Sequence, residues 1–94
     1  MATRVTIYGK QSDPDVKRLR REMRVLSVEH GLTDPADTRA QKSLADAGVA
    51  VSRPIVEVLR QDDTGSVYLT NPDEPTLRQC LYSEGILSVT SYWL

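Results

Sequence analysis

The chain has 94 residues, a net charge of −1 and one cysteine. The length fits one small domain, the near-zero charge argues against general binding to nucleic acid or to a membrane surface, and a lone cysteine excludes an internal disulfide. With one histidine as well, the chain lacks the ligands of a structural zinc site, so we expect neither a metal nor a cofactor.

The first predicted strand and helix flank a short polar turn. Residues 5–8 are β-branched or aromatic and end at Gly9, which is typical of a short strand. Asp13 is a natural N-cap, Pro14 fits the first helical position, and Asp15 adds a carboxylate to the first turn. The helix that follows has an apolar face formed by Val16, Leu19 and Met23. We expect function at this helix N-terminus, where donor groups and partial positive charge converge.

A second strand and a second helix are predicted next. Residues 25–28 form a short apolar run that Gly31 ends, and we interpret the run as a strand parallel to the first. Asp34 and Pro35 repeat the capping pattern of the first helix, so the second helix is expected to start at Asp34. Gly48 is typical of the residue that ends such a helix.

The rest of the chain predicts a hairpin and a third helix. Pro54 precedes a strand over residues 55–60, and proline suits a strand's first position because it cannot donate to the ladder. The turn sequence Asp-Asp-Thr-Gly separates this strand from an antiparallel one over residues 67–69. The third helix is expected to start near Asp73 and to end at Gly85.

The predicted order β-α-β-α-β-β-α describes one α/β domain over residues 1–85. A segment over residues 86–94 follows and carries six apolar side chains: Ile86, Leu87, Val89, Tyr92, Trp93 and Leu94. We expect this C-terminal segment to be an extra strand, a flap over its own sheet or a contact with another subunit, with Trp93 mostly buried. The sequence contains no signal peptide and no apolar run that could span a bilayer, which favours a cytoplasmic protein.

Three stretches resemble glutaredoxin-like members of the thioredoxin fold, and the resemblance covers residues 4 to about 85. VTIYGK with SDPDVKR is similar to the first strand and active-site turn of that family, RPIV to its cis-proline segment, and NPDEPTLRQCL to its last loop and helix. The resemblance implies a four-stranded mixed sheet of order 2-1-3-4 flanked by three helices. It also implies a cis peptide bond between Arg53 and Pro54.

The active-site turn departs from the family at the decisive position. Where the family has Cys-Pro-x-Cys, this chain has Asp13 in place of the nucleophilic thiol and Val16 in place of the resolving thiol. A carboxylate cannot form a mixed disulfide, so thiol–disulfide exchange is not expected here. Cys80 falls on the apolar face of the last helix and is expected to be an inert thiol.

The resemblance still implies a site. Lys10 stands where family members place a basic residue against a carboxylate of glutathione, and Arg53 precedes the presumed cis-proline. In the family geometry Arg53 would face Asp13 or Asp15 and form an ion pair that fills the groove. The predicted site therefore comprises Lys10, Asp13, Asp15, Val16, Arg53 and Pro54.

The sequence supports two functions. The first is a non-catalytic glutaredoxin-like module that binds a partner protein or a second copy of itself as a homodimer. The alternative is a binder of a small anion or glutathione-type ligand, or a degenerate thiol-redox protein, with Lys10, the helix N-terminus and Arg53 as the anion site. Oxidoreductase activity, nucleic acid and membrane are not expected, and Arg53 disfavours glutathione.

Overall fold

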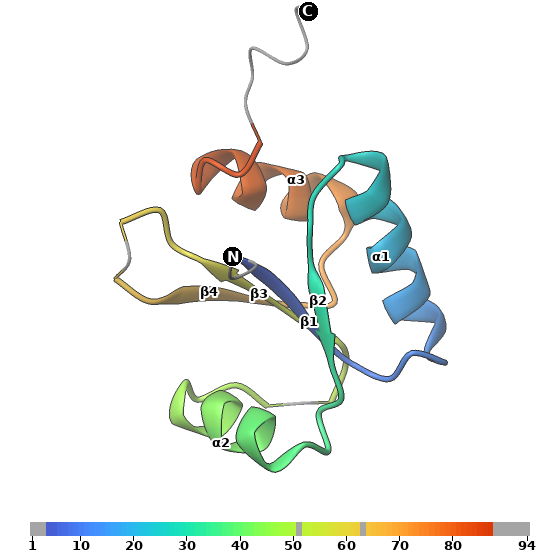
Figure 1. Ribbon diagram of the computed structural model, residues 1–94, viewed down its shortest axis with the longest axis vertical. Helices are drawn as coiled ribbons and strands as arrows, with labels where there is room; N and C mark the ends of the chain where they lie inside the picture. Colours follow the sequence, from blue (N-terminus) through green and yellow to red (C-terminus); the bar gives the residue numbers. More distant parts are fainter. Residues whose placement is uncertain (1–3, 51, 63, 88–94) are drawn as a thin grey trace, which may run out of the picture.

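The structure, a computed structural model, describes residues 4–50, 52–62 and 64–87 of the chain. Its strands are β1 (Val5–Tyr8), β2 (Gly31–Thr33), β3 (Ile55–Leu59) and β4 (Ser66–Thr70), and its helices are α1 (Pro14–Val25), α2 (Thr38–Asp46) and α3 (Glu74–Ser83). α1 and α3 lie on one face of the sheet and α2 lies on the other (Figure 1).

The strands form a mixed sheet of order β2-β1-β3-β4. β1 pairs in parallel with β2 and antiparallel with β3, and β4 continues the sheet antiparallel to β3. The predicted order of elements, the order of strands and the three helices are therefore confirmed over the described residues. This arrangement is compatible with a thioredoxin-like fold.

The prediction of a strand over residues 25–28 is wrong, because this run closes α1. Ser27 has a φ of 57°, and its N–H donates to the Arg24 carbonyl at 3.1 Å. The Val28 N–H donates to the Met23 carbonyl at 2.8 Å. Together these bonds form a Schellman motif, in which a left-handed residue ends the helix and the next apolar side chain packs inward. Val28 is accordingly buried in the core.

The parallel neighbour of β1 is β2, a few residues further along the chain. β2 begins at Gly31, where a strand was expected to end, and Ile7 lies opposite Leu32 in the register. The predicted pairing of residues 5–8 with residues 25–28 is therefore also wrong. The strand–helix–strand unit exists, but the connection from α1 back to the sheet is longer than the sequence pattern suggested.

The start of α2 is displaced in the same way. Asp37 is its N-cap, and one carboxylate oxygen accepts from the Arg39 N–H at 2.9 Å and from the Ala40 N–H at 3.3 Å. Asp34 instead opens a turn, since the Asp37 N–H donates to its carbonyl at 3.0 Å. Aspartate followed by proline suits the first two positions of a type I turn as well as a helix start, which explains the error.

The other predicted helix boundaries are confirmed. Asp13 caps α1 and Asp73 caps α3, each with its side chain accepting from an N–H of the first turn. Gly48 follows α2 with a φ of 72° and Gly85 follows α3 with a φ of 74°, the left-handed conformation that glycine tolerates best.

Two apolar clusters hold the layers together. The larger one joins α1 and α3 to the sheet through residues that include Ile7, Val16, Leu19, Met23, Val56, Leu77 and Leu81. The smaller one joins α2 to the opposite face through Tyr8, Ala40, Leu44 and Ile55. Because each helix presents its apolar stripe to the sheet, the N-terminus of α1 is fixed at the end of β1.

Ile86 and Leu87, the first two residues of the C-terminal segment, pack against the larger cluster beside α3. The expectations for residues 88–94, including burial of Trp93, lie outside the described residues. Among the helices of the described part of the chain, none is long and apolar enough to cross a membrane.

Candidate functional site

The candidate site lies where β1 ends and α1 begins, and Gly9 makes this junction possible. Gly9 is buried, and a Cβ built on it would lie 2.4 Å from Val16 Cγ2 and 3.5 Å from Pro54 Cβ. No side chain fits in that space without moving its neighbours. Glycine therefore lets the first turn of α1 approach both the end of β1 and the proline before β3.

Asp13 and Val16, which were compared with the two thiols of the glutaredoxin motif, have structural roles. Asp13 Oδ1 accepts a hydrogen bond from the Asp15 N–H at 2.8 Å, and the Asp13 N–H donates to the Lys10 carbonyl at 3.0 Å. Val16 is 0% exposed and belongs to the larger apolar cluster. Neither side chain carries a thiol, so these two residues cannot perform thiol–disulfide exchange.

The prediction of a cis bond before Pro54 is wrong, since the described residues contain no cis peptide bond. Trans is the default by about 0.5–1 kcal/mol even before proline, and only the family resemblance favoured cis. Pro54 is buried, and its carbonyl accepts from the Asn71 N–H at 2.7 Å. The cis-proline expected from the glutaredoxin resemblance is therefore absent at this position.

Asn71 and Arg18 connect the loop that contains Pro54 to α1. Neither was among the predicted site residues. Asn71 adopts a φ of 38°, and its side-chain oxygen accepts from Arg18 Nη2 at 2.9 Å. The same nitrogen donates to the Pro72 carbonyl at 3.1 Å. Arg18 thus links α1 to the loop between β4 and α3, which fixes the helix relative to Pro54.

The predicted pairing of Arg53 with an acidic residue of the first turn is confirmed for Asp15. Arg53 Nη2 lies 3.7 Å from Asp15 Oδ2, with the side chains 61% and 39% exposed. An ion pair this open contributes only about 0–1 kcal/mol to stability. The pair crosses from the loop before β3 to α1, and it is weak enough to be opened by a competing charge.

These elements enclose a shallow hollow of about 170 Å³. It is lined by Tyr8, Gly9, Lys10, Asp13, Pro35, Ser52, Arg53 and Pro54. Four predicted site residues, Lys10, Asp13, Arg53 and Pro54, are therefore brought together. Asp15 does not line the hollow but forms an ion pair with Arg53, which does. Val16 is buried in the core.

Four further residues line the hollow and were not among the predicted site residues: Tyr8, Gly9, Pro35 and Ser52. Tyr8 and Gly9 adjoin the predicted turn, so their position in the chain was a usable signal. Pro35 and Ser52 come from the loops on either side of α2. The place of Pro35 depends on β2, which was predicted too early in the chain, and the place of Ser52 depends on how the loop before β3 folds.

A hydrogen-bonded cluster lies on the α2 side of the sheet, next to the hollow, and centres on Glu57. Glu57 Oε1 accepts from the Tyr8 hydroxyl at 2.6 Å, and Oε2 accepts from the Ser66 and Tyr68 hydroxyls at 2.7 and 3.2 Å. Burial, together with the bond to Glu57, raises the pKa of Tyr8 above its ordinary value. Tyr8, which is one of the residues that line the hollow, is therefore held in place as a neutral phenol.

Two other side chains that could react, Cys80 and His30, do not line the hollow. Cys80 lies on α3, packs against the larger cluster and has its pKa raised mainly by burial. His30 lies between α1 and β2, with Nδ1 3.1 Å from the Val28 carbonyl oxygen. Within residues 4–50, 52–62 and 64–87, no group of three or more His, Cys, Asp or Glu side chains could hold a metal ion.

Comparison of the chain with protein families, with curated proteins and with solved structures gives no significant match.

Proposed function

We propose that this chain is a non-catalytic, glutaredoxin-like module that binds a partner protein through the surface around the N-terminus of α1. The observation that carries the proposal is the identity of the two residues at the helix start. Asp13 serves as the N-cap and Val16 is fully buried, so the position that would perform thiol exchange is occupied by structural side chains. The surrounding surface keeps two exposed cations, Lys10 and Arg53.

The size of the hollow favours a protein over a small molecule. Pockets for small ligands enclose about 300–1,000 Å³, whereas this hollow holds about 170 Å³. Arg53 lines the hollow and is paired with Asp15, so an anionic ligand such as glutathione would compete with Asp15 for the guanidinium. A partner that places one or two side chains in the hollow needs no deeper cavity.

The charges around the hollow favour an acidic segment of the partner. Lys10 is exposed and has no carboxylate within 4.0 Å among the residues that the structure describes. Arg53 is held only by its weak pair with Asp15. An incoming carboxylate would therefore meet one ammonium without an ion-pair partner and one guanidinium that is easily released, in a hollow that Tyr8 and Pro54 also line.

The proposal is tested by reversing these charges. Lys10→Glu with Arg53→Glu should abolish capture of the protein that the native chain retains from a lysate of its source cells. Arg39→Glu with Lys42→Glu makes the same change of charge on the exposed surface of α2 and should leave capture intact. Equal loss in both variants, or in neither, would contradict a docking surface at α1.

A small-anion site is the second candidate, because both cations border the hollow at a helix N-terminus. Such an end presents free N–H groups and partial positive charge to an anion. Glutathione and inorganic sulfate should be added separately while the amide shifts of residues 10–16 and 53 are followed by NMR. The protein-binding proposal predicts no saturable shift. Saturable shifts with either compound would favour the small-anion site instead.

A further inference from the structure

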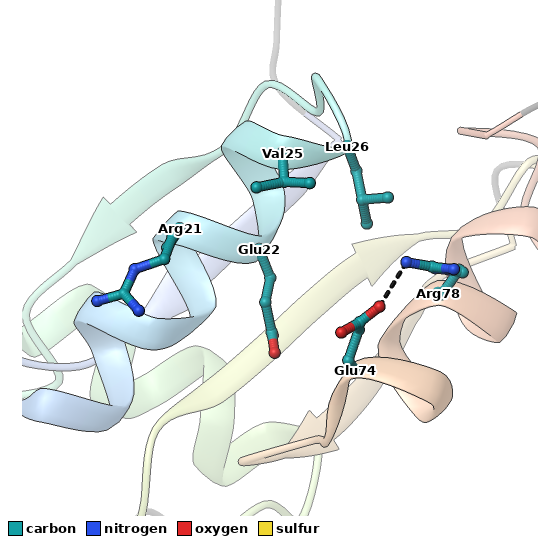
Figure 2. A pocket seen from close by; sticks show the side chains of 6 residues that line it. All are labelled: Arg21, Glu22, Val25, Leu26, Glu74 and Arg78. Atoms are coloured by element: carbon teal, nitrogen blue, oxygen red, sulfur yellow. Dashed lines mark hydrogen bonds and ion pairs between the residues drawn. The ribbon is translucent and has the colours of Figure 1, made fainter.

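A second hollow, far along α1 from the candidate site, lies between the end of α1 and the start of α3. It encloses about 220 Å³ and is lined by Arg21, Glu22, Val25, Leu26, Glu74 and Arg78. We refer to it as the α1–α3 groove. Figure 2 shows Val25 and Leu26 at the end of α1, with Glu74 and Arg78 joined by an ion pair on the facing helix.

The groove exposes an apolar side chain beside the guanidinium of Arg78. Val25 is 77% exposed, while the adjacent Leu26 packs against the larger cluster and forms the apolar floor. The Arg78 Nε is buried without a hydrogen-bond partner among the described residues, although the guanidinium pairs with Glu74 through Nη2. An occupant that supplies apolar surface against Val25 and Leu26 therefore fits this groove.

The depression continues from the groove along α3. A neighbouring hollow of about 450 Å³ shares Glu74 and Arg78 with the α1–α3 groove and extends past Tyr82 to Ser83 at the end of the helix. The chain leaves the described structure at Leu87, whose N–H donates to the Leu81 carbonyl at 3.1 Å. The next residues therefore start beside the end of α3 that this depression reaches.

We propose that the α1–α3 groove is the docking site of Tyr92 and Trp93 from the C-terminal segment of the same chain. The seven residues 88–94 span at most about 24 Å at about 3.4 Å each. α3 has ten residues and is about 15 Å long. The segment can thus run back along α3 and place its aromatic residues against Val25.

The composition of the segment suits this site. Residues 88–94, Ser-Val-Thr-Ser-Tyr-Trp-Leu, carry no charged side chain and supply hydroxyl and carbonyl oxygens near the aromatic rings. These oxygens can accept from the accessible N–H groups of the Arg78 guanidinium, whose side chain is 39% exposed, and an aromatic ring can stack on it. The same segment from a second copy has the same chemistry, but a short tether gives a local concentration of about 1 mM or more, which favours the chain's own segment.

The sole tryptophan makes the proposal measurable in the full chain. Trp93 fluorescence should be at short wavelength and poorly quenched by acrylamide. Val25→Asp should shift the emission to longer wavelength and increase quenching, because it places a charge in the groove. Ala45→Asp makes an equivalent change at an exposed position of α2 and should alter neither. Circular dichroism should show that both variants keep the native helix content.

A cross-linking measurement gives an independent answer. In a Cys80→Ser background, Val25→Cys with Trp93→Cys should form a disulfide within monomers, whereas Ala45→Cys with Trp93→Cys should not. An exposed Trp93 in the native chain, or shielding that Val25→Asp leaves unchanged, would overturn the proposal. Shielding that disappears on dilution, with disulfides formed between copies, would also overturn it and assign the groove to a second copy.

Discussion

Gly9 is the residue on which the geometry of the candidate site depends most. Gly9→Ala would place a methyl group 2.4 Å from Val16 Cγ2, so the first turn of α1 has to move. We expect the free energy of unfolding to fall by about 1–3 kcal/mol, as for other overpacked positions. Denaturant unfolding measures this change, and the amide shifts of residues 13–16 should report the displaced turn.

Gly31→Ala is the matched control for this substitution. A Cβ at Gly31 would meet only Thr6 Oγ1, at 3.9 Å, which is an ordinary contact. Stability should therefore change little. Equal loss in the two variants would show that the close approach at Gly9 is not what limits the site.

The hydrogen bond to Glu57 affects the pKa of the Tyr8 hydroxyl. The pKa of Tyr8 is raised first by burial and then by the hydrogen bond to Glu57. A raised tyrosine pKa stabilises the fold below the ordinary value of about 10, and this stability is lost as the pH rises through the folded pKa. Glu57→Gln should lower the pKa of Tyr8 while leaving it above the ordinary value, because the burial remains.

Ultraviolet titration of the tyrosines measures this effect, with Tyr8→Phe identifying the signal that belongs to Tyr8. Glu29→Gln, at an exposed position outside the cluster, should leave the titration unchanged. If the pKa of Tyr8 is unchanged in Glu57→Gln, the hydrogen bond to Glu57 does not contribute to its elevation.

At the scale of the elements, the described helices end by one mechanism, and the sequence showed two of the three ends. Gly48 and Gly85 were readable because glycine is the usual left-handed residue. Ser27 holds the same conformation at the end of α1, and it carries no such signal. The apolar residues around it were therefore interpreted as a strand, and β2 was placed too early.

Ser27→Gly should stabilise the protein. A left-handed residue other than glycine costs about 1–2 kcal/mol, and glycine's larger entropy in the unfolded chain offsets part of that gain. We expect the free energy of unfolding, measured by urea denaturation, to rise by about 1 kcal/mol. Ser43→Gly, inside α2, should lower it by about 0.5 kcal/mol. A lower stability in Ser27→Gly would contradict a Schellman motif with a left-handed Ser27 at the end of α1.

At the scale of the whole molecule, local patterns predicted the topology but only part of the site. Caps at Asp13 and Asp73 and the hairpin after Pro54 are encoded in short stretches, and these were confirmed. Pro35 in the hollow and the hydrogen bond from Tyr8 to Glu57 each bring together segments far apart in the sequence, so no local pattern predicts them. The bond before Pro54 is trans, although the family resemblance predicted cis, because no local feature of the sequence favours cis there.

The absence of a thiol at the helix start predicts a silent redox assay. The chain should neither reduce a mixed glutathione disulfide nor catalyse insulin reduction, because Asp13 and Val16 cannot attack sulfur. Cys80 should not compensate, since burial raises its pKa and a thiol reacts as the thiolate. Turnover that disappears in Cys80→Ser would contradict this expectation.

The most direct test of a docking surface at α1 is site-specific photo-cross-linking. A photoreactive amino acid replaces Lys10 in one variant and Lys42 in another, and both positions are exposed. After illumination in source cells, the Lys10 variant should form a discrete covalent complex with a partner protein, and the complex should be lost when Arg53→Glu is added. The Lys42 variant should form none. Cross-links of equal yield at both positions, or none at position 10, would contradict a partner-binding surface at the N-terminus of α1.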